Sequence, residues 1–470
     1  MERCAAAVLY GLSVRYVSTR GRAPALGFCD TLLAGLATDG GLYVPERWPT
    51  LPAPTPGEPY ARVAAAVVSA FAGDELELDL LERLCAEAYA SFRHPAVCPL
   101  VQLDADEWLL ELFHGPTLAF KDLALQLVGR LFDHVLTLRD ERITVLVATS
   151  GDTGSAAISG LASCSRADVV VLYPEGRVSD VQRRQMTTVD KPNVHAVAVA
   201  GTFDDCQAIV KQLFGDAAFR ERVGLAAANS INWARVAAQV AYYVWATSAL
   251  GDRPLTFAVP TGNFGNVLAG WVARSCGVPL ERLVIGSNAN DILPRLITSG
   301  QMEMRGVVPT LSPSMDIQVS SNLERLLFEL YDRDPERTTS ELAGFAATGS
   351  LALDGNALAS LRDLFEASSL DDGATLAAMR AEYERSGTLL DPHTAVGLAA
   401  GRARTRGRST PLVALATAHP AKFPEAVERA TGVSPALPPA LADLMERPER
   451  SESVRADVDA VRRLVERLVA

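Results

Sequence analysis

The sequence has few lysines, although it is rich in positive charge. Only four of its 44 basic residues are lysines, at positions 121, 191, 211 and 422, so the other 40 are arginines. An arginine keeps its proton at any ordinary pH, whereas a desolvated lysine can lose its proton and attack a carbonyl group. A lysine in an apolar setting is therefore a candidate for chemistry in this chain.

Other shortages exclude whole classes of protein. The seven cysteines are an odd number without a CxxC pair, which predicts neither a zinc site nor a disulfide framework and favours a reducing compartment, the cytoplasm. No apolar run reaches the roughly 20 residues of a membrane helix. The net charge of −12 argues against a nucleic-acid surface. We expect a cytoplasmic protein with a small-molecule partner, and we interpret residues 1–14 as an extension without a targeting role.

Lys121 stands in an apolar setting. It lies in residues 113–122 (Phe-His-Gly-Pro-Thr-Leu-Ala-Phe-Lys-Asp), and three more apolar residues follow at 123–125. Apolar surroundings lower the pKa of an ammonium group. This pattern predicts a Schiff base between Lys121 and pyridoxal phosphate. The alternative is a solvated lysine near a helix start, and the scarcity of lysine favours the reactive interpretation.

A glycine-rich turn supplies the second part of such a site. Residues 260–266 (Pro-Thr-Gly-Asn-Phe-Gly-Asn) follow an expected strand and open an expected helix. Such a turn points several N–H groups inward, and the helix N-terminus adds partial positive charge, so a phosphate fits. The alternative is a tight helix entry. Lys121 favours phosphate binding, because a cofactor held by an imine at one end needs a phosphate cup at the other.

A second strand–glycine–helix turn lies at residues 150–155 (Ser-Gly-Asp-Thr-Gly-Ser). Ligands of open α/β sheets bind beyond the carboxyl ends of the strands, where both turns would lie. Ser150, Gly151, Asp152 and Thr153 are therefore candidates for binding a substrate carboxylate. Asp152 is equally compatible with a role as the N-cap of the helix.

Strand patterns alternate with helical patterns from about residue 101, which is typical of a parallel α/β fold. We expect strands at 143–148, 168–172, 194–200, 255–259, 283–286 and 412–416. We expect helices at 61–72, 78–92, 203–214, 232–250, 266–276 and 461–469. Residues 14–97 look like a separate segment, and the chain from residue 435 has the pattern of an exposed helical tail.

Eight motifs together resemble the threonine synthase family of fold-type-II pyridoxal-phosphate enzymes. They stand in family order at residues 16–21, 35–43, 114–122, 149–155, 229–235, 262–266, 391–395 and 417–423, and the resemblance covers roughly residues 15 to 445. Within the family the chain is similar to the longer bacterial and fungal branch, which has an extra N-terminal domain.

The resemblance implies a domain organisation. Two parallel-sheet α/β domains would follow an N-terminal domain at 14–97. The large cofactor-binding domain would comprise 98–135 and 240–430, the small mobile domain 136–239, and a helical tail 431–470.

The resemblance also implies roles for single residues. Lys121 would form the Schiff base and shuttle protons. Gly262, Asn263, Phe264, Gly265 and Asn266 would bind the cofactor phosphate. The Thr417 hydroxyl would face the pyridine nitrogen without protonating it, which suits eliminations; alternatively it is a strand-end hydroxyl bonded locally.

The family's substrate is O-phospho-L-homoserine, which is converted with water to L-threonine and phosphate. The substrate phosphate needs cationic or N–H donors, and the candidates for binding it are Asn232, Arg235 and His114. His393 and His419 each adjoin a proline and are left out of the catalytic set, because such histidines often order a turn.

Two other functions remain open. A lyase on the same scaffold would release 2-oxobutyrate, ammonia and phosphate from phosphohomoserine or phosphothreonine. A non-catalytic pyridoxal-phosphate-binding relative is of another class, and the intact Lys121, glycine turn and Thr417 argue against it. The sequence leaves monomer or homodimer open and predicts no metal.

Overall fold

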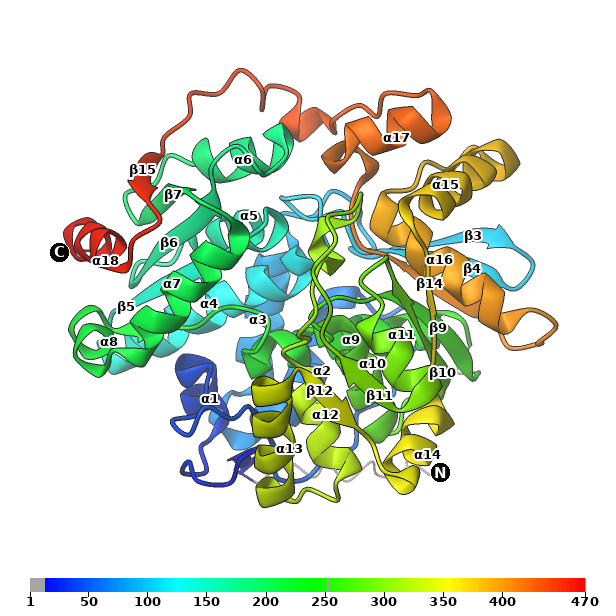
Figure 1. The fold of residues 1–470 in the computed structure, drawn as a ribbon, viewed down its shortest axis with the longest axis horizontal. Coiled ribbons are helices and arrows are strands. Elements are labelled where there is room, and N and C mark those ends of the chain that lie inside the picture. The colour runs from blue at the N-terminus through cyan, green and yellow to red at the C-terminus, as the bar shows by residue number, and fades with distance from the viewer. Residues whose placement is uncertain (1–12, 252, 470) are drawn as a thin grey trace, which may run out of the picture.

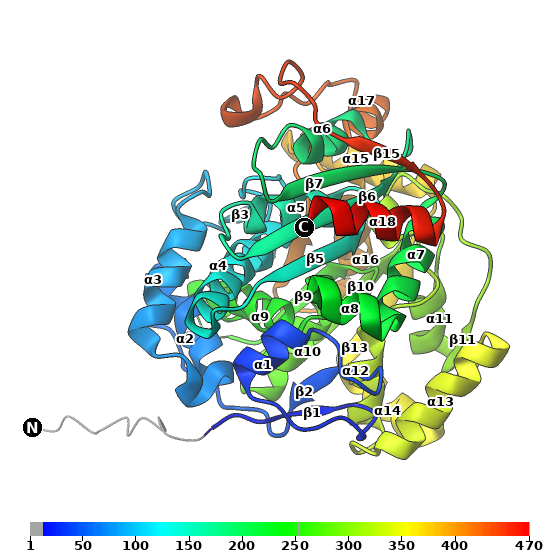
Figure 2. The same cartoon turned by 90° about the vertical axis from the view of Figure 1, so that its left-hand side faces the viewer.

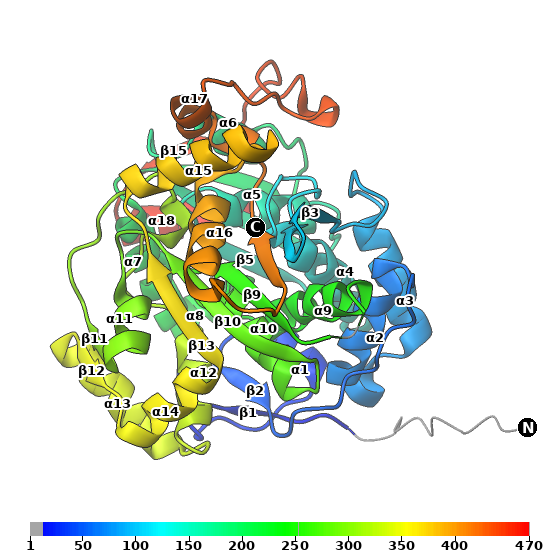
Figure 3. The ribbon, with the colours of Figure 1, turned by 90° about the vertical axis from the view of Figure 1, so that its right-hand side faces the viewer.

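The computed structural model describes residues 13–251 and 253–469 as two parallel sheets with helices around them and an N-terminal segment packed below (Figures 1–3). Residues 1–12 lie outside the described residues, so the interpretation of residues 1–14 as an untargeted extension stays a prediction. Within the described part, no helix combines the length and apolar character that a bilayer crossing needs. The α/β fold class with parallel sheets is confirmed.

The larger sheet has the strand order β13-β10-β9-β14-β4-β3, and only the pair β3–β4 is antiparallel. Its strands are β3 (Leu100–Asp104), β4 (Glu107–Glu111), β9 (Leu255–Pro260), β10 (Leu280–Ser287), β13 (Phe365–Ser369) and β14 (Leu412–Ala416). Every residue of β9 and β14 is buried, as the near-continuous apolar sequence of a central parallel strand requires. The expected strands at 255–259, 283–286 and 412–416 are confirmed.

The smaller sheet has the order β15-β7-β6-β5-β8, and all of its pairs are parallel. Its strands are β5 (Ile143–Ala148), β6 (Ala167–Pro174), β7 (Val194–Ala200), β8 (Leu225–Ala226) and β15 (Glu452–Arg455). The first three confirm the expected strands at 143–148, 168–172 and 194–200. The boundaries expected for the two domains stay a prediction, although the two sheets fall within them apart from β15.

The expectation of an exposed helical tail is wrong. The helix expected at 461–469 is present as α18 (Val458–Leu468), but Val461, Leu464 and Val465 are buried in the core of the smaller sheet. Before it, β15 pairs in parallel with β7 (Figures 1 and 2). This strand has four residues, and three of them are polar, so it carries no periodic signal that the sequence alone could reveal.

The N-terminal segment packs on the larger domain and shares its core. Its strands β1 (Tyr16–Ser18) and β2 (Tyr43–Pro45) pair antiparallel. The expected helices are confirmed as α2 (Tyr60–Ala72) and α3 (Leu78–Tyr89), and both pack near α1 (Phe28–Ala34), α4 (Lys121–Arg139) or α9 (Trp233–Ala249). The indole N–H of Trp233 donates to the Tyr16 hydroxyl at 3.0 Å, which joins this segment to α9.

Helices cover both sheets (Figures 1 and 3). Those around the smaller sheet are α18 and also α5 (Asp152–Leu161), α6 (Asp180–Thr187), α7 (Phe203–Gly215) and α8 (Ala217–Val223). Those of the larger domain include α10 (Gly265–Ser275), α11 (Ile292–Ser299), α12 (Leu323–Leu330), α13 (Pro335–Thr348), α14 (Gly355–Leu364), α15 (Asp372–Ser386), α16 (Pro392–Thr405) and α17 (Pro424–Thr431). The expected helices at 203–214, 232–250 and 266–276 correspond to α7, α9 and α10. A separate antiparallel pair of short strands, β11 (Gln301–Glu303) and β12 (Ser350–Ala352), packs against α11 and α13.

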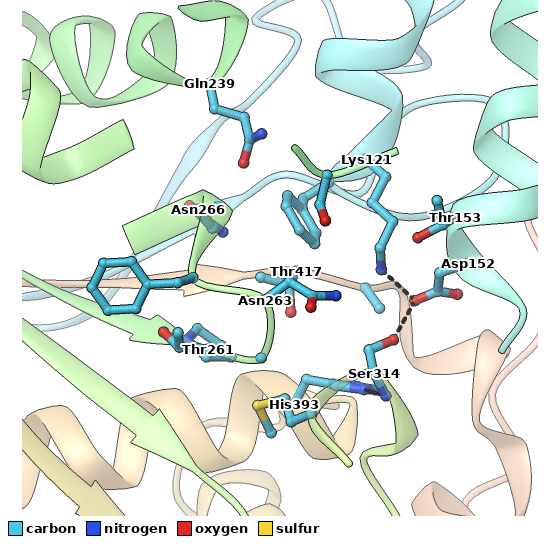
Figure 4. A pocket seen from close by; sticks show the side chains of 18 of the residues that line it. Lys121, Asp152, Thr153, Gln239, Thr261, Asn263, Asn266, Ser314, His393 and Thr417 are labelled. Atoms are coloured by element: carbon cyan, nitrogen blue, oxygen red, sulfur yellow. Dashed lines mark hydrogen bonds and ion pairs between the residues drawn. The ribbon is translucent and has the colours of Figure 1, made fainter. Parts of the chain in front are cut away.

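Three turns meet between the two sheets. They follow β5, β9 and β14, and each leaves the carboxyl end of its strand. The side chains from these turns line one cavity (Figure 4). This is the place where parallel α/β sheets generally bind ligands.

Candidate active site

Lys121 is the first residue of α4, and its amine points into the cavity (Figure 4). The turn before it is held tightly. Leu118 has a positive φ of 64°, and the buried Asp122 carboxylate accepts the Thr117 amide at 2.8 Å and the Thr117 hydroxyl at 2.7 Å. Burial lowers the pKa of Lys121, because it disfavours the ammonium form. The direction expected from the apolar sequence is thus confirmed.

Asp152 faces the amine of Lys121. One carboxylate oxygen, Oδ2, accepts Lys121 Nζ at 3.1 Å and the Ser314 hydroxyl at 3.3 Å. The other, Oδ1, lies 2.9 Å from Lys422 Nζ and accepts the Gln182 side-chain amide at 2.9 Å. Burial alone would raise the pKa of Asp152, but the charges of Lys121 and Lys422 outweigh it and hold that pKa well below its ordinary value. Asp152 is therefore a buried carboxylate.

The turn after β9 forms the opposite wall. Residues 262–266 all line the cavity, and Phe264 has a positive φ of 64° that a non-glycine residue adopts only under constraint. A Cβ on Gly262 would lie 2.4 Å from the Ser314 carbonyl oxygen, so only glycine fits there. Among the described residues, no hydrogen bond is donated by the backbone N–H groups of 262–266 to another protein group.

Two buried side chains at this wall carry unpartnered donors. Asn266 accepts the Tyr243 hydroxyl on its Oδ1 at 3.1 Å, while its Nδ2 has no partner among the described residues. Arg235 donates from one terminal nitrogen to the Ala228 carbonyl at 3.2 Å, and its Nε has no partner there either. Both residues line the cavity. Burial lowers the pKa of Arg235 to about 10, so the guanidinium still carries its charge at neutral pH.

Thr417 and His393 complete the cavity floor. The Thr417 amide donates to the Thr394 hydroxyl at 3.1 Å, which fixes the end of β14 against α16. The His393 ring pairs with Asp391 at 2.8 Å through Nδ1 and accepts the Ser314 amide at 3.3 Å on Nε2. These two contacts assign the proton of the ring to Nδ1. Figure 4 shows Thr417 between Lys121 and His393.

The structure brings together most of the residues that the sequence predicted for this site. Lys121, Asp152, Thr153, Arg235, Thr417 and the whole turn 262–266 line the same cavity. Asp152 is not the N-cap of α5, because Gly151 occupies that position, and the first-turn amide of Gly154 donates to the Thr149 hydroxyl at 2.8 Å. The alternative interpretation of Asp152 as a helix cap is wrong.

Four predicted substrate residues do not line the cavity. His114 pairs with Glu111 at 2.7 Å. Asn232 caps α9 and donates to the carbonyls of Leu32 and Ala227, so its side chain is fully used in local structure. Ser150 and Gly151 stand beside the cavity, where Gly151 adopts a φ of 135° against Gln182. For these four, a direct contact with substrate stays a prediction.

Sequence reasoning missed three participants. Lys422 was one of only four lysines, and its rarity was the signal that could have found it. His393 was set aside because it adjoins a proline, yet it lines the cavity. Ser314 lies in a stretch with only a short 3-10 turn, and no local pattern predicts that this stretch crosses the larger domain to reach Asp152.

The residues present fit pyridoxal phosphate. A phosphate needs N–H donors without protein partners, and the turn 262–266 and Asn266 Nδ2 supply them. An aldehyde needs an amine with a lowered pKa, which Lys121 supplies. A pyridine nitrogen needs a hydrogen-bonding neighbour, and the Thr417 hydroxyl faces the same space. In all three respects the cavity matches the cofactor.

Comparison with known proteins agrees with this geometry. Family models described as threonine synthase N terminus, pyridoxal-phosphate dependent enzyme, and threonine synthase C-terminal match residues 15–89, 94–359 and 394–465. The chain is 50% identical over 444 residues to the threonine synthase of Pseudomonas aeruginosa, covering 93% of this chain and 95% of that protein.

Solved structures agree as well. The structure of threonine synthase with bound pyridoxal phosphate from Brucella melitensis is 49% identical, with a TM-score of 0.94 over 97% of this chain and 100% of that one. Yeast threonine synthase is 38% identical, with a TM-score of 0.90 over 97% and 99%. The fold, the cavity and these matches over nearly the whole length lead to one conclusion: the chain belongs to the threonine synthase family of pyridoxal-phosphate-dependent enzymes.

Proposed function

We propose that this protein is a threonine synthase that converts O-phospho-L-homoserine and water to L-threonine and phosphate. The observation that carries the proposal is a single cavity with two anion-binding parts. The amine of Lys121 and the turn 262–266 are placed to hold the cofactor, and Arg235 adds a buried cation with an unpartnered Nε on the same wall. A cofactor phosphate and a substrate phosphate need two such parts.

Pyridoxal phosphate, when bound, withdraws electrons from the substrate carbon that carries the amine. Lys121 is the base that this chemistry needs, because burial lowers its pKa and so favours the free amine. The amine takes the proton from the substrate Cα and returns it in the last step. Loss of a second proton, from Cβ, lets phosphate leave from Cγ. Water then adds its hydroxyl at Cβ and a proton is taken up at Cγ, so threonine forms without net oxidation.

Thr417 determines how strongly the cofactor withdraws electrons. Its hydroxyl donates a hydrogen bond but no charge, in contrast to a carboxylate, and the pyridine nitrogen then stays largely unprotonated. This weaker withdrawal favours elimination over transamination. The fixed backbone of Thr417, tied to Thr394, keeps the hydroxyl at the cavity floor.

Arg235 is proposed to bind the substrate phosphate. It is 3% exposed and retains its charge, and a buried guanidinium without an anionic partner is costly unless a ligand supplies one. Asp152 does not serve as that partner, because its two carboxylate oxygens already contact Lys121 and Lys422. Thr153 and Ser230 also line the cavity and add hydroxyl donors.

The test is phosphate release from O-phospho-L-homoserine by the cofactor-loaded protein, measured beside Arg235→Gln. We expect the wild-type protein to release phosphate. We expect the Arg235→Gln variant to have a KM raised at least about tenfold, because it loses one charge-assisted hydrogen bond to the substrate phosphate. Arg274→Gln, on the surface of α10, is the matched control and will keep the wild-type KM. No phosphate release by well-folded, loaded wild-type protein would contradict the proposal.

The lyase alternative uses the same residues and differs only in the fate of the product, so product identity separates the two. A non-catalytic relative is disfavoured because the reactive lysine, the phosphate turn and Thr417 are all in place. We also propose that the protein works in the cytoplasm, as a monomer or homodimer. The support for a reducing compartment is that six cysteines in the described residues are free and buried.

A further inference from the structure

The two buried lysines of this chain contact the same carboxylate. Lys121 is 9% exposed and Lys422 is fully buried, whereas Lys191 and Lys211 are exposed. Lys121 Nζ lies 3.1 Å from Oδ2 of Asp152, and Lys422 Nζ lies 2.9 Å from Oδ1. Almost all other basic residues of this chain are arginines, so the contact of two lysines with one aspartate indicates a specific role for lysine at this place. Only Lys121 lines the cavity.

Lys422 is fixed from three sides. It ends the short 3-10 turn Pro420–Lys422 that follows β14, so it belongs to the larger domain, whereas Asp152 begins α5 of the smaller one. Its Nζ also donates to the Thr117 carbonyl at 2.7 Å, in the turn that Asp122 holds before Lys121. The backbone of Lys422 accepts the Ser179 hydroxyl at 3.4 Å at the N-terminus of α6. These contacts leave Lys422 no access to substrate.

The two oxygens of Asp152 therefore have different neighbours. Oδ1 contacts Lys422 and Gln182, neither of which lines the cavity. Oδ2 contacts Lys121 and Ser314, and both of these line the cavity. If Lys121 were the sole cationic partner, loss of its proton would leave a buried carboxylate unpaired, and that cost would hold the proton on Lys121. A second ammonium, that of Lys422 at 2.9 Å from Oδ1, removes this obstacle.

We propose that Lys422 is a positioning residue that acts through Asp152: it neutralises the carboxylate and repels a second charge, so that Lys121 can serve as a free amine. The proposal rests on the proposed function only in that Lys121 is the reacting amine. The charged groups that face Lys121 are Asp152, Lys422 and Arg235, and those that face Lys422 are Asp152 and Asp122. His393 faces Asp152 from the larger domain. Two ammonium groups share one carboxylate, and this balance of charge favours loss of a proton from Lys121, the lysine that lines the cavity.

The direct test measures the protonation of Lys121 without any catalytic turnover. The full-length, cofactor-free protein is treated briefly with acetic anhydride across a range of pH, and acetylation of Lys121 is quantified by mass spectrometry relative to the exposed Lys211 of the same chain. Only the free amine reacts, so the midpoint of the profile reports the pKa of Lys121. We expect Lys422→Gln to move this midpoint upward by about one unit, which is a tenfold slower acetylation at a fixed pH below it.

Lys422→Arg is the charge-preserving variant, and we expect its midpoint and its acetylation rate to stay within about a factor of two of wild type. Lys191→Met, which removes an exposed lysine, is the control for lysine loss alone. On the loaded enzyme, the acidic limb of kcat against pH will move upward in Lys422→Gln and be restored in Lys422→Arg, a pattern that a purely structural role does not produce.

An unchanged Lys121 midpoint in folded Lys422→Gln overturns the proposal, as does a Lys422→Arg profile displaced as far as that of Lys422→Gln. Circular dichroism establishes folding first. If Lys422→Gln does not fold, Lys422→Arg still decides, because it must keep the wild-type midpoint. Failure of the proposed function is distinguishable: a protein that releases no phosphate from O-phospho-L-homoserine still yields the acetylation profile.

Discussion

At the scale of single residues, Lys121 combines burial with a nearby anion, two influences that act in opposite directions. Burial lowers its pKa and Asp152 raises it, while Lys422 and Arg235 lower it further, and the net direction is downward. A lysine paired with one aspartate in the same cavity would instead be held as an ammonium. The surrounding cations are thus part of what makes this lysine reactive.

Replacing Lys121 by alanine removes both the imine-forming amine and the base. We expect Lys121→Ala to lose the visible absorbance of the protein–cofactor imine and to lower kcat at least about 1,000-fold, within the range for loss of a general base. Lys211→Ala, which changes an exposed lysine, will keep both. Retention of colour and activity in Lys121→Ala would show that another amine carries the chemistry.

The lowered pKa of Lys121 fixes the sign of the pH dependence. The base must be unprotonated in the enzyme–substrate complex, so kcat rises as the pH rises through the pKa of Lys121 and then levels off. Since this pKa lies below the ordinary 10.5, the limb will fall at lower pH than for a solvated lysine. A profile of kcat from pH 5 to 10.5 checks this, and a kcat that still rose tenfold per pH unit at the top of that range would contradict it.

At the scale of elements, the turn between β9 and α10 depends on one glycine. Gly262→Ala places a Cβ 2.4 Å from the Ser314 carbonyl, and backbone on both sides must move. We expect cofactor affinity to fall at least about tenfold, because the N–H groups of 262–266 are displaced from the phosphate position. Titration of the cofactor-free protein with pyridoxal phosphate measures this.

Gly306→Ala is the matched control, since a Cβ there meets nothing within 4 Å and the backbone has no positive φ. Its cofactor affinity will equal that of wild type. Equal affinities for Gly262→Ala and Gly306→Ala would mean that the turn can shift without cost and does not hold the phosphate.

The C-terminal elements β15 and α18 are expected to stabilise the smaller domain. Val465 is fully buried against that sheet, so Val465→Asp buries a carboxylate without a partner and will lower the free energy of unfolding by about 3 kcal/mol or more. Urea unfolding followed by circular dichroism checks this. The neighbouring Arg463 is exposed, and Arg463→Asp will leave the transition nearly unchanged; an equal loss in both variants would contradict the packing of α18.

Central strands were predictable from the sequence, and edge strands were not. The apolar runs of β5, β9 and β14 are buried on both faces, which leaves a continuous signal. The edge strands β13 and β15 contain polar residues and derive their stability from pairing with β10 and β7, distant in sequence. Local patterns carry no information about such pairing.

The same contrast holds for the site. Lys121 and the turn 262–266 were predictable because their chemistry depends on local sequence. His114 and Asn232 were chosen as donors near the other motifs. In the structure they contact Glu111, Leu32 and Ala227, and a direct contact with substrate stays a prediction. Lys422 reaches Asp152 only through the packing of one domain on the other. No spacing along the chain encodes that contact.

At the scale of the whole molecule, the site lies where two domains meet, and its charged groups come from both. Asp152 belongs to the smaller sheet, and Lys422, Ser314 and His393 belong to the larger domain, so the carboxylate is bound across the boundary. A shift of one domain against the other would separate Asp152 from Lys422 and change the protonation of Lys121. The mobility of the smaller domain stays a prediction, and with it we expect closure around substrate and activation of the base to be linked.

The central claim is that this architecture directs the reaction to threonine, and the fate of the carbon skeleton tests it most directly. Purified protein loaded with pyridoxal phosphate is given O-phospho-L-homoserine, and phosphate, L-threonine and 2-oxobutyrate are quantified in the same samples over time. The account predicts one threonine for each phosphate released and no accumulation of 2-oxobutyrate. Phosphate matched by 2-oxobutyrate and ammonia would contradict it and assign the protein to the lyase reaction.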